Sequence, residues 1–140
     1  MSGFLLDTNV ISEPIKEKPD PSVREWFNSV KEEDTYLSVL TLGEIRRGIA
    51  SLPLSARRTR LESWFQNVLS RFENRILPVN EAVADRWGVM MARSEAAGRT
   101  LPGVDSLIAA TALEHNLTFV TRDTSELAIS GVQLLNPWES

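Results

Sequence analysis

The stretch Phe4-Leu5-Leu6-Asp7-Thr8-Asn9, close to the start of the chain, decides the fold. Its apolar run is typical of a short buried strand, and the Asp-Thr-Asn that follows is typical of a strand that turns directly into a helix. We expect this first strand, residues 3–6, to lie at the centre of a sheet. Asp7 then occupies a strand-to-helix junction, where its carboxylate can cap the helix or take part in chemistry.

Three later acids stand in comparable settings. The stretches are Thr41-Leu42-Gly43-Glu44, Leu101-Pro102-Gly103-Val104-Asp105-Ser106 and Phe119-Val120-Thr121-Arg122-Asp123. In a parallel α/β sheet the functional crevice lies at the carboxyl ends of the strands, where the N-termini of the following helices also point. We therefore expect the four carboxylates to converge at one edge of the sheet, although they span most of the chain.

Strand and helix patterns alternate along the rest of the sequence. We expect strands over residues 3–6, 35–39, 76–79, 118–121 and 132–135, and helices that begin near Asp20, Thr41, Ser55, Asn80 and Pro102. This alternation predicts an α/β sandwich with a mostly parallel sheet. No internal repeat is visible, so a single domain over residues 1–140 is expected.

The composition limits the chemistry that is possible. The absence of cysteine, and the position of the one histidine, His115, near a predicted helix C-terminus, leave oxygen atoms as the expected ligands of any metal. No apolar run approaches the roughly 18 residues of a membrane span, and no signal peptide is evident. We expect a cytoplasmic protein without membrane contact. The net charge of -4 argues against a broad basic surface for nucleic acid.

Each acid also has a purely structural interpretation. Residues 41–44 and 123–126 both fit a capping box, Asp7 can cap the helix after the first strand, and Asp105 suits the positive end of a helix. Capping does not require the four acids to meet, however, whereas a hard cation such as Mg²⁺ requires a few carboxylates on rigid elements. Convergence therefore favours a divalent-metal site.

Small polar residues accompany the acids at the strand ends. Asn9, Ser38 and Thr121 can orient carboxylates from outside the ligand set, although ordinary turn chemistry also explains each of them. Five arginines crowd one quarter of the chain and are either solvated helix faces or phosphate ligands. These are Arg46, Arg47, Arg57, Arg58 and Arg60.

Four ordered blocks of the sequence resemble the PIN-domain nucleases, and more closely the VapC-type toxins of VapBC toxin–antitoxin pairs, including their FitB-like branch. The blocks are Leu6-Asp7-Thr8-Asn9-Val10-Ile11-Ser12-Glu13, Ser38-Val39-Leu40-Thr41-Leu42-Gly43-Glu44-Ile45-Arg46-Arg47-Gly48-Ile49, Asp105-Ser106-Leu107-Ile108-Ala109-Ala110-Thr111-Ala112 and Leu117-Thr118-Phe119-Val120-Thr121-Arg122-Asp123. They run in the family order across nearly the whole chain. The resemblance implies a PIN-like three-layer sandwich and carries the family's acidic quartet onto Asp7, Glu44, Asp105 and Asp123.

The same resemblance implies a Mg²⁺- or Mn²⁺-dependent endoribonuclease. Such a toxin is inhibited by a small VapB-type antitoxin, commonly forms a homodimer, and meets operator DNA only through the antitoxin. Asn9 and Thr121 match the family's usual polar companions of the quartet. One departure is Glu126-Leu127, where relatives often have Asp-Phe, which leaves open whether Glu126 assists the site.

On this basis we predict hydrolysis of RNA phosphodiesters by water that a metal activates. Asp7, Asp105 and Asp123 are expected to hold one metal, and Glu44 to bind a second one or to orient the attacking water. Two rivals remain open. One is an aspartyl-phosphate phosphatase with Asp7 as nucleophile, although Asn9 stands where such sites usually carry a second acid. The other is a catalytically silent binding or regulatory protein with the PIN fold.

Overall fold

A five-stranded sheet in which every pair of neighbours is parallel forms the middle of the molecule. The computed structural model describes residues 2–139. The strand order is β3-β2-β1-β4-β5, so the first strand is central, as predicted. The strands are β1 (Phe4–Leu6), β2 (Thr35–Ser38), β3 (Ile76–Leu77), β4 (Thr118–Val120) and β5 (Leu134–Leu135).

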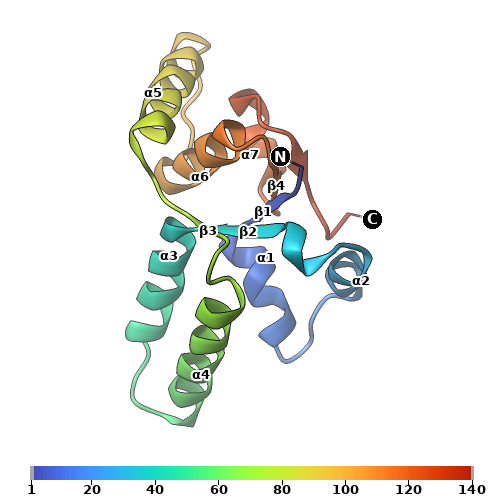
Figure 1. Cartoon of the computed structure of the whole chain (residues 1–140). Helices are drawn as coiled ribbons and strands as arrows, with labels where there is room; N and C mark the ends of the chain where they lie inside the picture. The colour runs from blue at the N-terminus through green and yellow to red at the C-terminus, as the bar shows by residue number, and fades with distance from the viewer. Residues whose placement is uncertain (1, 140) are drawn as a thin grey trace.

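Helices cover both faces of this sheet, which confirms the predicted three-layer α/β sandwich (Figure 1). The α-helices are α1 (Thr8–Ser12), α2 (Pro21–Ser29), α3 (Val39–Ala50), α4 (Ala56–Arg71), α5 (Glu81–Ala96), α6 (Gly103–Glu114) and α7 (Thr124–Leu127), and the 3-10 helices are η1 (Glu13–Ile15), η2 (Glu32–Asp34) and η3 (Ala128–Ser130). The first four α-helices lie on one side of the sheet, and the other three lie on the opposite side (Figure 1). No helix among residues 2–139 is both long enough and apolar enough to cross a membrane.

Side-chain caps set several of the helix starts. Asp20, Ser55 and Asn80 each accept a hydrogen bond from a backbone amide of the first turn, and the helices begin beside them as predicted. The strands β2, β3 and β4 end one or two residues earlier than predicted, and β1 and β5 begin one or two residues later. Ser38, the last residue of β2, already caps α3, and Thr121, just after β4, accepts from the amide of Asp123. Asn116 has the positive φ of 56° expected of a residue that terminates α6.

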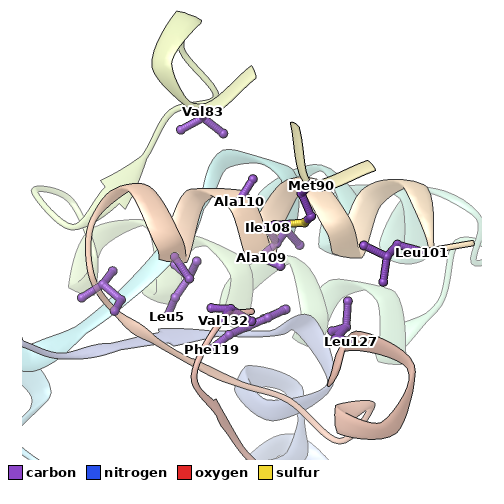
Figure 2. Close-up of a cluster of buried hydrophobic side chains, with 12 residues drawn as sticks. Leu5, Val83, Met90, Leu101, Ile108, Ala109, Ala110, Phe119, Leu127 and Val132 are labelled. Carbon is purple, nitrogen blue, oxygen red and sulfur yellow. The ribbon is translucent and has the colours of Figure 1, made fainter. Parts of the chain in front are cut away.

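The alternation of side chains along β1 divides the core between the two faces of the sheet. Leu5 packs with the cluster under α5 and α6, whereas Leu6 packs with the cluster under α1, α3 and α4. Figure 2 shows Leu5 and Phe119 on the sheet beneath Ile108 and Ala109 of α6. Both faces of the central strand are therefore buried, which explains its unbroken apolar sequence.

Gly3 permits the close approach of β1 to its neighbour. Its φ is +155°, and a Cβ at this position would lie 2.7 Å from the carbonyl oxygen of Asp34. We expect Gly3→Ala to lower the free energy of unfolding by roughly 1–3 kcal/mol, because backbone atoms must move to relieve the contact. Gly88→Ala is the control, since nothing lies within 4 Å of the added Cβ.

The control change lies in the interior of α5 and should raise the free energy of unfolding by about 0.5–1 kcal/mol. Urea unfolding of both variants measures the difference. Equal stability of Gly3→Ala and the wild type would show that β1 does not need a glycine before it.

Candidate functional site

Asp7 is the most deeply buried acid of the site, with 3% of its surface exposed. Its Oδ1 accepts from the backbone amide of Thr8 at 2.8 Å, so it caps α1 as predicted. Its Oδ2 accepts from the hydroxyl of Thr121 at 2.6 Å. Burial raises the pKa of Asp7, these two hydrogen bonds lower it only in part, and the charges of Glu44 and Asp123 raise it further.

Glu44 reaches the site from α3, but not through the predicted capping box. Helix α3 begins directly after Ser38. The Ser38 hydroxyl oxygen caps this helix by accepting a hydrogen bond from the backbone amide of Leu40 at 3.1 Å. Thr41 consequently lies inside the helix, and its buried hydroxyl has no hydrogen-bond partner within residues 2–139. Glu44 Oε1 instead accepts from the hydroxyl of Thr8 at 2.6 Å. The capping-box prediction for residues 41–44 was therefore wrong.

Asp123 lies just beyond β4 and also lacks the capping box that was predicted for residues 123–126, because its side chain makes no cap hydrogen bond. Its Oδ2 accepts a long bond of 3.5 Å from Asn9 Nδ2. Its backbone amide donates to Thr121 Oγ1 at 3.1 Å. Thr121 thus joins two acids, since the same hydroxyl group donates to Asp7 and accepts from Asp123.

Asp105 lies half-buried in the first turn of α6, as predicted. Its pKa is raised to about 6, first by burial and then by the negative charges of the other three acids and of Glu126. Acids from four separate stretches therefore lie within electrostatic reach of one another. His115 follows the other end of the same helix, at its C-cap.

The donor set suits a hard divalent cation. All candidate ligands are oxygens, and a cation would offset the mutual repulsion that helps to raise the pKa values of Asp7 and Asp105. The buried Oδ1 of Asn9 has no hydrogen-bond partner among the described residues. As placed, no three acids of residues 2–139 form a metal-holding group. Cation binding would therefore draw the acids closer together than they lie here.

The loop at residues 121–123 is held by the C-terminal segment. Asn136 Nδ2 donates to the carbonyl oxygen of Arg122 at 3.4 Å, and the Arg122 guanidinium lies over the Trp138 ring at 4.8 Å. The backbone amide of Trp138 donates to Asn136 Oδ1 at 2.9 Å, which fixes the turn. These residues could not be predicted from the sequence, because no local pattern links positions so far apart along the chain.

An open groove with a volume of about 1160 Å³ begins at the site. Thr8 and Glu44, which hydrogen-bond to each other, are among the residues that line it. Its other walls come from the segment after α1, from α3 and from α4, and they include Arg57 and Arg60. The groove therefore connects the candidate metal site with part of the arginine-rich quarter of the sequence.

Comparisons with known proteins show what the whole chain is similar to. The family model described as PIN domain matches residues 4–129. Toxin FitB of Neisseria gonorrhoeae is 41% identical over 96% of the chain and 98% of its own length. VapC ribonuclease Y4jK of Sinorhizobium fredii is 38% identical over 97% of the chain and 98% of its own length. The solved structure of FitAB bound to an IR36 DNA fragment superposes with a TM-score of 0.94, at 38% identity over 98% of the chain and 96% of the matched one.

The raised pKa of Asp105 predicts a stability cost that depends on pH. Because its pKa of about 6 in the folded protein exceeds the ordinary value of 3.8, the charged carboxylate destabilises the fold above pH 6. This cost shrinks as the pH falls from 6 toward 4 and disappears once Asp105 is protonated in both states. Asp105→Asn removes the charge and keeps the shape.

In EDTA at pH 8 we therefore expect Asp105→Asn to melt a few degrees above the wild type, and the difference to vanish near pH 4. Differential scanning calorimetry across this pH range measures it. A variant that melts below the wild type at pH 8 would contradict the electrostatic coupling of the four acids.

Proposed function

Because the chain belongs to the PIN domain family, we propose that it is a metal-dependent endoribonuclease that acts as the toxin of a VapBC-type toxin–antitoxin pair. Relatives that carry the names toxin FitB and VapC ribonuclease support this proposal, since both align with nearly the whole chain. The observation that carries it is the electrostatic coupling of four acids from separate stretches. Structural capping alone accounts for only one of them, Asp7.

We propose for the four acids the roles that the sequence led us to expect. Asp7, Asp105 and Asp123 would hold one Mg²⁺ or Mn²⁺, and Glu44 would help to bind a second ion or orient the attacking water. When bound, the cation neutralises charge that builds on the phosphoryl oxygens and lowers the pKa of water. The chain itself aims the ligands, because the hydroxyl of Thr121 fixes Asp7 Oδ2.

The hydroxyl of Thr8 acts on Glu44 in the same way, at 2.6 Å. Such a hydrogen bond restricts the orientation of the carboxylate. Ser38 supports the same edge indirectly, since it sets the first turn of α3 and therefore the position of Glu44 one turn further on. Asn9 completes the set through its bond to Asp123.

The partners follow from the relatives. We propose that a VapB-type antitoxin binds this chain, that the toxin forms a homodimer, and that operator DNA is met only through the antitoxin. The FitAB complex on a DNA fragment supports this arrangement, because its fold and sequence are close to those of this chain. The cytoplasm is the proposed location, since the RNA substrate and the operator would both be found there.

Single substitutions in the quartet test the proposed nuclease. With RNA and Mg²⁺, we expect each of four variants to lower kcat/KM by at least about 100-fold: Asp7→Asn, Asp105→Asn, Asp123→Asn and Glu44→Gln. Loss of a residue that only hydrogen-bonds to a metal ligand typically costs roughly 10–100-fold, and loss of a ligand itself should cost at least as much. EDTA should abolish cleavage, and Mn²⁺ should restore it. Glu126→Gln is the matched control.

Like three of the quartet variants, the control removes a negative charge that acts on Asp105. Because Glu126 is exposed and its effect on Asp105 is the weakest of the four acids named, the control should retain activity within roughly threefold. If Asp7→Asn and Asp105→Asn cleave as fast as the wild type, the assigned site is wrong. Equal toxicity of the wild type and Asp7→Asn on expression would favour a silent binding protein with this fold. A trapped phosphate on Asp7 would favour the phosphatase instead.

A further inference from the structure

The structure sorts the crowded arginines into two groups. Arg46 donates to Glu62 at 2.8 Å and lies over the ring of Phe65 at 4.8 Å. Arg58 donates to the carbonyl oxygen of Leu52 at 2.9 Å and lies 3.9 Å from the same Glu62. These two side chains therefore have structural partners and are not free to bind a ligand.

Arg57 and Arg60 differ in both position and partners. Both line the groove that begins at Thr8 and Glu44, and both are exposed. Their spacing of three residues puts them on one face of α4. Within residues 2–139 neither makes an ion pair or a side-chain hydrogen bond. Two free guanidinium groups consequently project from one wall of the groove.

The other charges of the groove leave these arginines as its main free cations. Lys16 also lines it, but its ammonium group lies 2.8 Å from the buried carboxylate of Glu13. The acids of the groove are Glu17, which is exposed, and Glu44, which belongs to the candidate metal site. The groove thus carries negative charge at Glu44, beside the candidate metal site, and unpaired positive charge at Arg57 and Arg60, which could bind an anion.

We propose that this groove is the path of a single-stranded RNA segment that leaves the metal site, and that Arg57 and Arg60 bind its phosphates. The proposal rests on the proposed nuclease function, because it assigns the segment of the substrate next to the cleaved bond. Arginine presents a planar fork of donors that matches phosphate oxygens. Two such forks on one helix face can contact neighbouring phosphates of one strand.

The apolar part of the groove favours an unpaired strand over a duplex. A duplex presents phosphates and 2′-hydroxyls on its outside and keeps its base faces stacked, whereas an unpaired strand can lay its bases on apolar side chains. Six apolar residues line the groove beside the arginines. They are Ile15, Leu52, Leu61 and Trp64, which are at least partly exposed to a bound strand, and Ile45 and Ile49, which are buried.

The test compares matched arginine substitutions. Arg57→Ala and Arg60→Ala remove one free cation each from the groove. Arg47→Ala removes the same charge from an exposed position on α3 that is not among the groove-lining residues, and Arg93→Ala removes it from α5 on the opposite side of the sheet (Figure 1). Binding of a labelled single-stranded RNA of about 12 nucleotides is followed by fluorescence anisotropy in EDTA, where no cleavage occurs.

We expect Arg57→Ala and Arg60→Ala each to weaken binding roughly threefold to fivefold and to reduce the slope of log affinity against log salt by about 0.7. Arg47→Ala and Arg93→Ala should leave that slope unchanged. In Mg²⁺ the two groove variants should raise KM and leave kcat unchanged, because they remove contacts made equally before and during reaction. The same RNA annealed to its complement should bind the wild type more weakly, and the groove substitutions should not alter that binding.

The possible failures are distinguishable. If the wild type cleaves RNA but the groove variants bind it like Arg47→Ala, the groove proposal falls and the nuclease stands. If those variants bind RNA normally yet bind the cognate antitoxin more weakly, the arginines serve a protein partner and the proposal is overturned. If the wild type cleaves no RNA in Mg²⁺ or Mn²⁺, the proposed function fails whatever the arginines do.

Discussion

The hydroxyl of Thr121 and the carboxylate of Asp7 form the contact on which the site depends. This bond joins residues 114 positions apart, and it exists because β1 and β4 are parallel neighbours in register, with Leu6 opposite Val120. The two strands end opposite each other, so the residues that follow them, Asp7 and Thr121, lie side by side. A buried carboxylate without such donors would be destabilising, which explains why a hydroxyl rather than an apolar residue follows β4.

The hydrogen bond from Thr121 does not cancel the unfavourable electrostatics of the site. Two hydrogen bonds to Asp7 do not lower its pKa to the ordinary value, because burial and neighbouring carboxylates act in the opposite direction. Asp105, which lies on α6, is repelled by the same neighbouring carboxylates. Folding therefore brings together charges that would be more stable apart, and apolar packing on both faces of β1 must supply the compensating free energy. A bound divalent cation would offset this repulsion, which is consistent with the proposed metal site.

The sheet, and the nearness of the four acids to one another, could be predicted from the sequence because both depend on local signals that the fold preserves. The apolar run before Asp7 fixes the central strand, and the rule that strand ends meet at one edge brings the acids together. The capping box at residues 41–44 did not form because α3 begins earlier than the pattern predicts. Ser38 offered an earlier cap for α3, which freed Glu44 to accept from Thr8 on a different helix. Both Ser38 and Thr41 are possible caps in the sequence, and the point at which β2 ends decides between them.

Long-range contacts also explain what the sequence could not predict about the basic residues. Arg57 and Arg58 are adjacent and chemically identical, yet only Arg58 is oriented toward the carbonyl oxygen of Leu52 and toward Glu62. Composition therefore overestimates the cations that are free to act, and neither net charge nor clustering corrects the error. The relevant quantity is the number of guanidinium groups that folding leaves without a partner beside the site, because only these can bind a ligand without first breaking an internal contact. In this groove they are the two that share one face of α4.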